Sequence, residues 1–488
     1  MAMDRNVNVD VAVIGAGTAG LAAHRAAKAA GKRAVLIEGG PYGTTCARVG
    51  CMPSKLLIAA AEAAHAIGRA PGFGVHAGEV RVDREEVMAR VKRERDRFVG
   101  FVLKGVDTIA AEDRIRGHAR FLDPQTLEIE GGPVVRARAI VIATGSRAAI
   151  PPLLANLGDR LVINDDVFDW DALPRSVAVF GPGVIGLEIG QALARLGVRV
   201  VVLGRGGRVG PITDPYVQRA ALAAFSHDFE LDPDAHVQRV ERVGDEVEVE
   251  YLGPDGARRV ERFDYALAAT GRIPNVDRLG LERAGVVLGH RGVPVHDAFT
   301  LQAGQSHIFI AGDVSDDKPL LHEASDEGRI AGENAARFPA VSPGLRRVPL
   351  GIVFTDPQIA IVGGGFASLK THALATGEVS FEDQGRSRVM LRNQGHLRVY
   401  GDPETGRFLG AEMVGPDAEH IGHLLAWALQ AGMTVKRMLE MPFYHPVVEE
   451  GLRTALRDLA AKLAASNRLR EMGPRAIAAH AAPGVTSS

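Results

Sequence analysis

The stretch Val9-Asp-Val-Ala-Val-Ile-Gly-Ala-Gly-Thr-Ala-Gly20 decides the fold that the sequence predicts. It contains a short apolar strand, a turn with glycines at Gly15, Gly17 and Gly20, and the start of an alanine-rich helix. Glycines at this spacing permit a tight turn, close approach of a pyrophosphate and close packing of helix on strand, and the helix N-terminus attracts negative charge. The next apolar run ends in Glu38, which is well placed to accept a hydrogen bond from a ribose hydroxyl. We predict a dinucleotide-binding unit, with a structural βαβ unit as the alternative.

The same glycine-turn pattern occurs again at Gly181-Pro-Gly183-Val-Ile-Gly186, between predicted strands at 177–180 and 199–203. Each copy is followed later by a strand pattern that ends in Ala-Thr-Gly, first at Thr144-Gly145 and then at Gly271. A small-residue turn at a strand end lets the backbone approach a flat cofactor closely. The internal repeat therefore predicts two bound dinucleotides.

The second copy differs from the first at the end of its second strand, where Gly204 takes the place of Glu38. Arg205 follows directly, and Arg208 is close by. An acid at this place favours NAD through the 2′-hydroxyl, whereas arginine accommodates the 2′-phosphate of NADP. The change favours tolerance of, or preference for, NADP; the alternative is that Arg205 is only a solvated surface charge.

A third stretch, Gly43-Thr-Thr-Cys-Ala-Arg-Val-Gly-Cys-Met-Pro-Ser-Lys55, holds Cys46 and Cys51, the only two cysteines of 488 residues. On a regular helix, residues five apart have Cα atoms about 8.6 Å apart, whereas a disulfide tolerates at most about 7 Å. A bridge therefore needs a distorted turn, which Gly50 and Pro53 permit, and a distorted bridge is easier to reduce. The following helix start favours thiolate. We predict a redox-active dithiol; the alternatives are a zinc site and two buried structural thiols.

The composition is that of an ordinary soluble globular protein of several domains, with 46% apolar residues and 24% charged residues. A net charge of −2 gives no electrostatic case for binding nucleic acid or an acidic membrane surface. The first ten residues contain no apolar core of a secretory signal, and no apolar run reaches the roughly 18 residues of a membrane helix. We therefore expect a cytoplasmic protein, in which disulfides are not needed for stability.

Two further residues are candidates for chemistry. Asp313 ends the apolar run Phe309-Ile-Ala-Gly-Asp, where it would bond a cofactor polyol or cap a helix. His445 precedes a helix that begins with Glu449 and Glu450. It would exchange a proton with a thiol while a carboxylate orients its ring, or it is an ordinary histidine at a helix start.

The remaining chain is assigned by pattern. Residues 58–107 are predicted helical, with a solvated charged face at 84–97, and a proline-rich linker at 339–349 precedes an α+β domain. That domain is predicted to contain helices at 418–430 and 449–465 and strands around Ile352, Ala360, Val389 and Val399. The composition from Ser466 onward predicts a loose tail.

In this order, the features resemble the pyridine nucleotide-disulfide oxidoreductases of the two-cysteine class, over residues 9 to about 463. The stretches 46–55, 183–188 and 445–450 are most similar to the dihydrolipoyl dehydrogenase branch. The resemblance implies an α/β fold with two Rossmann-like dinucleotide-binding domains, as in glutathione reductase, and a C-terminal α+β dimerisation domain. The boundaries expected are 1–155 and 274–345 for the two parts of the FAD-binding domain, 156–273 for the NAD(P)-binding domain, 346–470 for the dimerisation domain and 471–488 for a flexible tail.

The resemblance also implies roles for single residues. Cys46 would exchange with substrate, and Cys51 would lie beside the flavin as the charge-transfer thiolate. Lys55 and Glu188 match a pair near the flavin N5. His445, oriented by Glu450, would be the acid-base catalyst and would reach the cysteines of the other subunit of a homodimer. The implied FAD-binding residues are Gly15, Gly17, Gly20, Glu38, Thr45, Lys55, Thr144, Gly145 and Asp313, and the implied NAD(P)-binding residues are Gly181, Gly183, Gly186, Arg205 and Gly271.

The activity implied is electron transfer between a dihydrolipoamide-like dithiol, the Cys46–Cys51 disulfide, FAD and NAD or NADP. The dithiol would be a small molecule or a lipoyl domain, with a 2-oxoacid dehydrogenase complex as one context. The alternative is an NADPH-dependent reductase of a low-molecular-weight disulfide, similar to glutathione reductase. Mercuric reductases and large thioredoxin reductases need additional C-terminal redox residues, which the tail does not show. A flavin-binding protein without turnover is the alternative from another class.

Two positions depart from the family pattern. Thr44 stands where a second glycine is usual, and Arg48 stands where asparagine is usual between the cysteines. We expect both to alter the rim of the disulfide pocket. Arg48 would either lower the pKa of the nucleophilic sulfur or recognise an acidic substrate.

Overall fold

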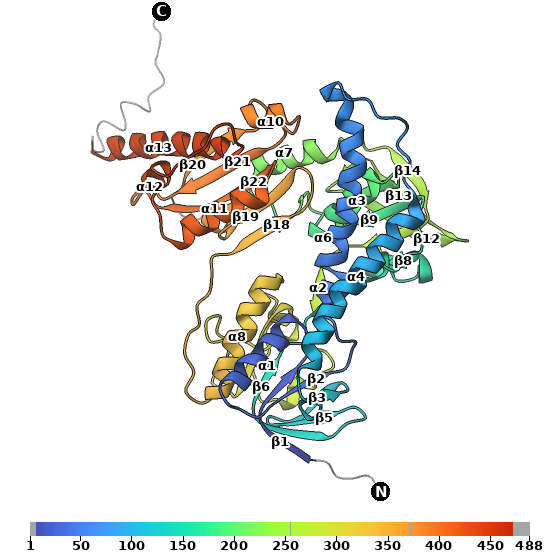
Figure 1. Ribbon diagram of the computed structural model, residues 1–488, viewed down its shortest axis with the longest axis vertical. Coiled ribbons are helices and arrows are strands. Elements are labelled where there is room, and N and C mark those ends of the chain that lie inside the picture. The colour runs from blue at the N-terminus through green and yellow to red at the C-terminus, as the bar shows by residue number, and fades with distance from the viewer. Residues whose placement is uncertain (1–5, 254, 371–372, 472–488) are drawn as a thin grey trace, which may run out of the picture.

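The computed structural model describes residues 6–253, 255–370 and 373–471, and its first unit is built on a seven-stranded sheet (Figure 1). The strand order is β3-β2-β1-β6-β5-β4, with β17 beside β6. The strands are β1 (Asn6–Ile14), β2 (Ala34–Glu38), β3 (Arg114–Arg116), β4 (Ala119–Asp123), β5 (Thr126–Ile129), β6 (Val134–Ile142) and β17 (Ile308–Ile310). β17 comes from far along the chain and pairs in parallel with β6, so this unit is assembled from two separate stretches.

Helices α1 (Thr18–Ala29) and α8 (Leu321–Arg337) pack tightly against each other on this sheet. The contact needs glycine on α8: a Cβ on Gly328 would lie 2.1 Å from the Ala19 carbonyl oxygen, and one on Gly332 would lie 2.3 Å from that of Ala23. The alanine-rich pattern that predicted α1 thus also supplies the flat surface on which α8 lies.

The second unit repeats the arrangement with a parallel five-stranded sheet in the order β11-β10-β9-β15-β8. Its elements are β8 (Leu161–Val162), α5 (Asn164–Val167), β9 (Ser176–Phe180), α6 (Val184–Arg195), β10 (Arg199–Leu203), α7 (Pro215–Phe225), β11 (Glu230–Asp232) and β15 (Tyr265–Ala268). A three-stranded antiparallel sheet is added by β12 (His236–Val243), β13 (Glu246–Leu252) and β14 (Arg258–Phe263). The short pair β7 (Ser146–Ala148) and β16 (Arg272–Pro274) connects the two units.

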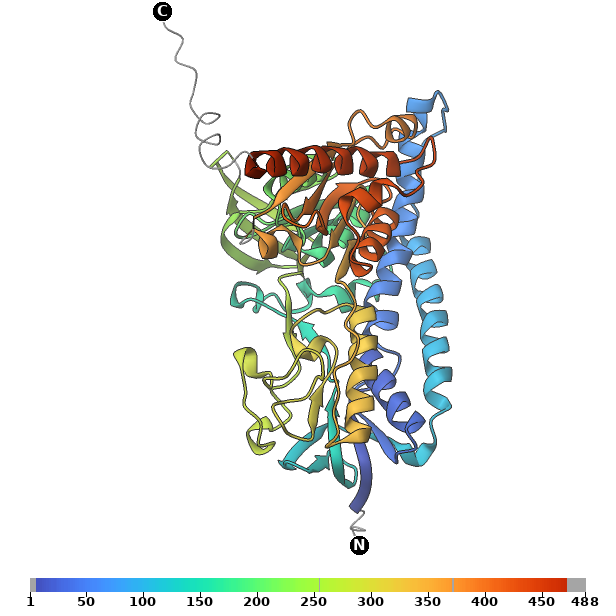
Figure 2. The ribbon, with the colours of Figure 1, turned by 90° about the vertical axis from the view of Figure 1, so that its left-hand side faces the viewer.

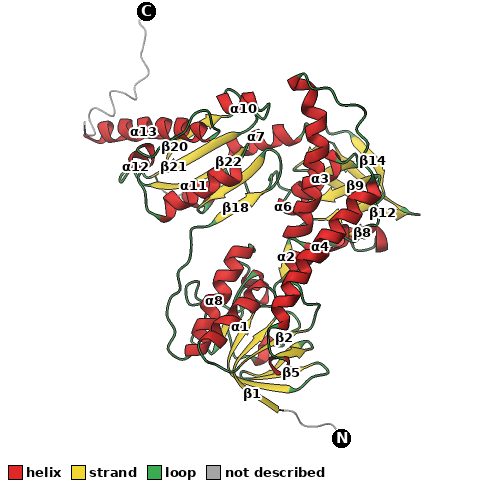
Figure 3. Cartoon of the chain, in the orientation of Figure 1, coloured by secondary structure: helices red, strands yellow, loops and turns green. Residues whose placement is uncertain are grey.

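The third unit is an antiparallel five-stranded sheet covered by helices (Figure 3). Its strands are β18 (Leu350–Val353), β19 (Gln358–Val362), β20 (Ala375–Ser380), β21 (His396–Gly401) and β22 (Phe408–Gly415). Its helices are α9 (Gly365–Leu369), α10 (Gly385–Val389), α11 (Ala418–Gln430), α12 (Val435–Leu439) and α13 (Glu449–Glu471). The predicted α+β character of this part is confirmed, and α11 has the predicted bounds.

Two predictions of secondary structure are wrong. Val389 was expected in a strand, but it ends helix α10, where the Gln384 side chain accepts from the Ser387 amide and caps the helix; β20 is the edge strand instead. The helical prediction for 58–107 fails at 74–83, because Pro71, Gly72 and Gly74 end the first helix in a 3-10 turn. The predicted loose tail lies mostly outside the described residues, and its described part up to residue 471 is helix α13.

The cysteines lie on a pair of helices that join the units. α2 (Thr45–Val49) and α3 (Cys51–Arg69) follow directly on each other, and α4 (Arg84–Asp107) runs beside α3 (Figure 2). α3 also packs against α6 of the second unit. Among the described residues, no helix is long and apolar enough to cross a membrane.

We expect Gly328→Ala to lower the free energy of unfolding by about 1–3 kcal/mol, because the added methyl group must push α8 away from α1. Gly100→Ala in α4 is the matched control: it has no atom within 4 Å of its Cβ position and should stabilise by about 0.5–1 kcal/mol. Thermal and urea unfolding of both variants measure this. Equal effects of the two substitutions would contradict the packing account.

Candidate active site

Each glycine turn uses its first glycine to pass close to a neighbouring strand end. Gly15 and Gly181 both have φ of 107°, in the region that favours glycine. A Cβ would lie 2.3 Å from the Ala143 carbonyl oxygen in the first turn and 2.5 Å from that of Ala269 in the second. The two copies are therefore equivalent in backbone geometry as well as in sequence.

The other two glycines of each turn have different structural roles. A Cβ on Gly20 or Gly186 would lie 1.8 or 2.0 Å from the carbonyl oxygen of the first glycine of its turn, so these positions let the helix pack on the strand. Gly17, at the N-cap of α1, has no protein atom within 4 Å of its Cβ position. That open cradle at a helix N-terminus is where a phosphate group is expected to approach.

Two cavities meet at the first turn. One, of about 480 Å³, is lined by both cysteines, Lys55 and Asp313, and the other, of about 490 Å³, is lined by Glu38, Thr144 and neighbouring loops. Both are lined by Gly17, Thr45, Ala143 and Gly145. The shared lining residues make one long cleft, which fits an extended dinucleotide with one end at the thiols.

Most predicted FAD-binding residues lie along this cleft. Gly15, Gly17, Glu38, Thr45, Thr144 and Gly145 line its second cavity, and Lys55 and Asp313 line its first, whereas Gly20 lies behind the turn. Each Glu38 carboxylate oxygen accepts one backbone N–H, from Ala16 at 2.7 Å and from Gly40 at 2.7 Å. Each oxygen keeps a further lone pair for a ribose hydroxyl.

The two cysteines are brought together by the break between α2 and α3. Cys46 lies in α2, Cys51 is the first residue of α3, and Gly50 between them has a non-helical conformation. Both are free thiols, with Cys46 half-buried and Cys51 exposed in the cavity. Each thiol shifts the pKa of the other, so the two are not independent structural thiols.

The two thiols of this pair are not equivalent. The hydrogen bond from Cys46 and the positive charge of Lys55 lower the pKa of Cys51 to about 7, against the effect of burial. The same hydrogen bond, together with burial, raises the pKa of Cys46. Near neutral pH the negative charge of the reduced pair therefore resides on Cys51.

Lys55 and Glu188 form an ion pair between two units of the fold. The Lys55 ammonium lies 2.7 Å from the Glu188 carboxylate, whose side chain is only 5% exposed. The other carboxylate oxygen accepts the backbone N–H of Phe354 at 2.9 Å, and the Phe354 ring lies under the ammonium at 4.6 Å. The pair places a cation and an anion in the cavity that contains the thiols.

His445 and Glu450 are also paired. The His445 Nδ1 lies 3.0 Å from each carboxylate oxygen, and Glu450 also accepts the Val447 N–H at 3.3 Å. The hydrogen bond from His445 holds the pKa of Glu450 below its usual range. The imidazole is 80% exposed, and His445 is not among the described residues that line the cysteine cavity of its own chain.

The second turn carries the predicted change from acid to glycine. A Cβ on Gly204 would lie 2.4 Å from the Pro233 carbonyl oxygen, so no side chain fits there. Arg205 and Arg208 are exposed, and neither forms an ion pair or side-chain hydrogen bond with the described part of the chain. Gly271, with φ of 109°, turns the chain at the end of the following strand.

Two residues of the site carried no signal in the sequence. Phe354 supports Lys55 and Glu188 from the third unit, but it lies in an ordinary apolar run. Asn164 is buried and donates its side-chain amide to the Val49 carbonyl at 3.0 Å, which holds the end of α2. A lone asparagine 115 residues away could not have been connected to the cysteines from pattern.

Thr44 and Arg48 lie close to the disulfide segment, and their effect on the rim of the disulfide pocket stays a prediction. Both side chains belong to the residues that line the second cavity, and neither is among those that line the cysteine cavity. Because Cys46 and Val49 share one face of α2, residues 44, 45 and 48 share the other. Thr44, at φ of 58°, caps α2 by accepting the Ala47 N–H at 3.3 Å.

The pKa of Cys51 should respond in opposite directions to its two charged neighbours. We expect Lys55→Met to raise the midpoint of Cys51 alkylation above pH 7, and Glu188→Gln to lower it, because the first removes a stabilising cation and the second a destabilising anion. The measurement is the pH dependence of iodoacetamide labelling of the reduced protein. Trypsin cleavage after Arg48 places the two labelled cysteines on different peptides. An unchanged midpoint in both variants would refute the account that Lys55 and Glu188 set the pKa of Cys51.

Comparison with protein families identifies two regions of the chain. Residues 9–328 match the model of the pyridine nucleotide-disulphide oxidoreductases, and residues 350–456 match the dimerisation domain of the same family. The second match supports a homodimer.

Individual relatives extend over nearly the whole chain. Dihydrolipoyl dehydrogenase of Haloferax volcanii is 32% identical, covering 93% of this chain and 96% of its own. The corresponding enzyme of Bacillus subtilis is 30% identical, covering 91% and 97%. Mercuric reductase of Shigella flexneri is 31% identical, covering 91% and 80%.

Solved structures agree with the predicted fold class. LpdA of Mycobacterium tuberculosis has a TM-score of 0.78 at 27% identity, covering 92% of this chain and all of LpdA. The HOCl-induced flavoprotein disulfide reductase RclA of Escherichia coli has a TM-score of 0.76 at 24% identity, covering 92% and 99%, which shows likeness of fold. The chain therefore belongs to the pyridine nucleotide-disulphide oxidoreductase family, whose members use FAD and NAD(P)H.

Proposed function

We propose that the protein is a dihydrolipoyl dehydrogenase-like enzyme that passes electrons between a dithiol substrate, the Cys46–Cys51 pair, FAD and NAD(P). The observation that carries the proposal is that the two cysteines lie in one cavity beside the Lys55–Glu188 ion pair, which makes the two thiols unequal. One thiol has its pKa lowered to about 7 beside Lys55, and the other has its pKa raised. A pair of this kind suits an exchange in which one sulfur reacts with substrate and the other holds the charge.

The substrate half of the reaction belongs to Cys46 and His445. His445 takes a proton from one substrate thiol, and the resulting thiolate attacks Cys46 of the oxidised pair. The Cys46–Cys51 bond breaks, and Cys51 leaves as a thiolate that Lys55 stabilises. The second substrate thiol then attacks the sulfur bound to Cys46; its proton passes to Cys46, which leaves as a thiol, and the substrate disulfide is formed. Two electrons and two protons have left the substrate, and the pair is reduced.

The second half of the reaction needs the cofactors. The predicted FAD-binding residues that line the cleft would hold FAD, which would supply two-electron exchange between the dithiol and the nicotinamide. The turn Gly181–Gly186, Arg205 and Gly271 would hold the nicotinamide nucleotide.

The proton partner of the pair would come from the second subunit. Glu450 orients the His445 imidazole through Nδ1 and leaves Nε2 exposed. The exposure of this ring, and the matched dimerisation domain, support a site completed across the dimer. We also propose domain boundaries at residues 155, 273, 345 and 470, and a cytoplasmic location.

The relatives include dihydrolipoyl dehydrogenases and mercuric reductases, and the cysteine count favours the first activity over the second. A soft metal ion prefers several thiolates, and this sequence has only Cys46 and Cys51. The lipoamide branch needs no more than the pair. A lipoyl domain or a free dithiol would therefore be the substrate, and a 2-oxoacid dehydrogenase complex is one context for it.

A second candidate is an NADPH-dependent reductase of a low-molecular-weight disulfide. Gly204 cannot be replaced by an acid in its crowded position, and Arg205 and Arg208 are unpaired within the described residues. These facts favour a 2′-phosphate, and NADPH is the usual electron donor for reduction. The first candidate stays preferred because the stretches 183–188 and 445–450 are most similar to the dihydrolipoyl dehydrogenase branch.

The two candidates separate in a matrix of substrates. We expect kcat/KM for dihydrolipoamide oxidation, or lipoamide reduction, to exceed that for glutathione disulfide reduction by at least about 100-fold, whichever nicotinamide is used. Steady-state rates with each disulfide and each nucleotide decide this. Preference for glutathione disulfide would replace the first candidate with the second.

The nicotinamide preference depends on Arg205 in this account. We expect Arg205→Ala to raise KM for NADPH about 10-fold, the cost of one lost charge-assisted phosphate contact at an exposed site, and to leave KM for NADH within about twofold. Arg219 is another exposed arginine of the same unit. Arg219→Ala is therefore the control that shows the effect of removing one positive charge elsewhere on this unit. Equal changes with NADPH and NADH would show that Arg205 is only a surface charge.

A further inference from the structure

The side chain of Arg48 has no partner in the described chain, although it is half-buried. Its Nε is fully enclosed and makes no hydrogen bond, and no ion pair or side-chain hydrogen bond is formed by the rest of the guanidinium. An enclosed guanidinium N–H without a partner is costly, so a ligand that accepts from it is expected.

The position of Arg48 is fixed by its surroundings. The side-chain stem passes Gly43, where a Cβ would lie 3.1 Å from Arg48 Cγ and Cδ and 3.0 Å from Val99 Cγ1. Gly43 has φ of 116°, so both its backbone and its missing side chain make room for the arginine. The guanidinium is thereby held at the second cavity, on the face of α2 opposite Cys46.

Three other charged side chains of that cavity, those of Glu38, Arg147 and Asp277, are already bonded, and Arg278 is exposed, unlike the half-buried Arg48. Arg147 makes a two-pronged ion pair with Asp277, at 3.0 and 3.2 Å, and also donates to Asn275. Glu38 is occupied by two backbone N–H groups. Arg48 is thus an uncommitted cation in a cavity that also contains the open Gly17 cradle at the N-terminus of α1.

We propose that Arg48 binds the diphosphate of FAD, opposite the glycine turn. The diphosphate is the anionic part of the dinucleotide, and the glycine turn is where such a group approaches a Rossmann-like unit. Guanidinium binds phosphate oxygens through paired N–H donors, and it does so more strongly when it is shielded from water. Arg48 then holds the cofactor from the disulfide segment itself, two residues after Cys46.

This assignment replaces both roles that the sequence suggested for Arg48. The charge of Arg48 acts on Asp165 of α5, whose pKa burial raises overall, against the lowering effect of Arg272 and Arg48. The positive charge that acts to lower the pKa of both Cys46 and Cys51 is that of Lys55. Arg48 is therefore a cofactor-binding residue and has no direct part in thiol chemistry.

The test is the affinity of the apoprotein for FAD, measured by quenching of flavin fluorescence. We expect Arg48→Met, which keeps the stem and removes the donors, to raise Kd about 10- to 100-fold, and Arg48→Lys to raise it less. Arg147→Met is the matched control, because it removes a cation of the same cavity that is already paired. We expect it to change Kd by less than about threefold.

A second readout separates the cofactor role from a role at the thiols. The pH midpoint of Cys51 alkylation in the reduced apoprotein should be the same in Arg48→Met as in the wild type. If Kd for FAD in Arg48→Met stays within twofold of wild type, if Arg147→Met weakens FAD equally, or if the alkylation midpoint moves, the proposal is overturned. Thermal unfolding of the apoproteins checks folding, and if Arg48→Met does not fold, Arg48→Asn decides by the same criteria.

Discussion

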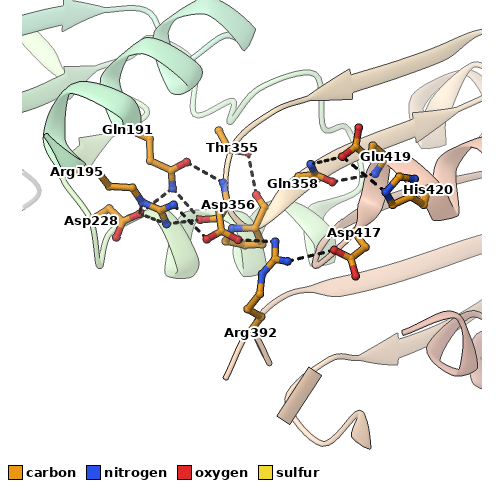
Figure 4. A network of polar contacts seen from close by, with 11 residues as sticks. Gln191, Arg195, Asp228, Thr355, Asp356, Gln358, Arg392, Asp417, Glu419 and His420 are labelled. Carbon is orange, nitrogen blue, oxygen red and sulfur yellow. Dashed lines mark hydrogen bonds and ion pairs between the residues drawn. The ribbon is translucent and has the colours of Figure 1, made fainter. Parts of the chain in front are cut away.

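One face of helix α6 connects the parts of this protein. Glu188, Gln191 and Arg195 follow one another along that face, and all three bind the segment 354–356 of the third unit. Gln191 accepts the Asp356 N–H and donates to its carbonyl, both at 2.8 Å, while Arg195 reaches its carboxylate at 3.1 Å (Figure 4). Because α6 begins at the second glycine turn, this docking positions that turn relative to the thiols.

The docking works because its buried charges are paired. Burial alone would raise the pKa of Asp356, but the charges of Arg392 and Arg195 hold it below its usual range. Arg392 also forms an ion pair with Asp417 at 3.2 Å, which extends the network further within the third unit (Figure 4). One turn before Gln191, Glu188 is neutralised by Lys55 from α3. The same face of α6 therefore holds the second and third units together and, through Glu188, binds Lys55, the cation that lowers the pKa of Cys51.

The sequence predicted those parts whose geometry is local. Each glycine turn depends on contacts within one strand-turn-helix unit, and only glycine tolerates them, so spacing was sufficient. The pairing of Lys55 with Glu188 was accessible only through resemblance, because 133 residues separate them. Phe354 and Asp356 were not predicted, since a backbone N–H at a domain contact leaves no pattern. That Arg48 lines the second cavity was not predicted, because α2 has only five residues, too few for a periodic signal to show which residues share a face.

The central claim is that Cys51 carries the thiolate of the reduced pair beside FAD. Anaerobic titration of the purified holoprotein with dithionite tests it most directly. The account predicts that, in the wild type, a long-wavelength charge-transfer absorbance appears after two electrons per FAD. Cys51→Ser should never show it. Cys46→Ser has no disulfide to reduce, so it should show the absorbance before any reductant is added and lose it as FAD is reduced. Direct bleaching of the flavin, with no such absorbance at the two-electron stage, would contradict the account.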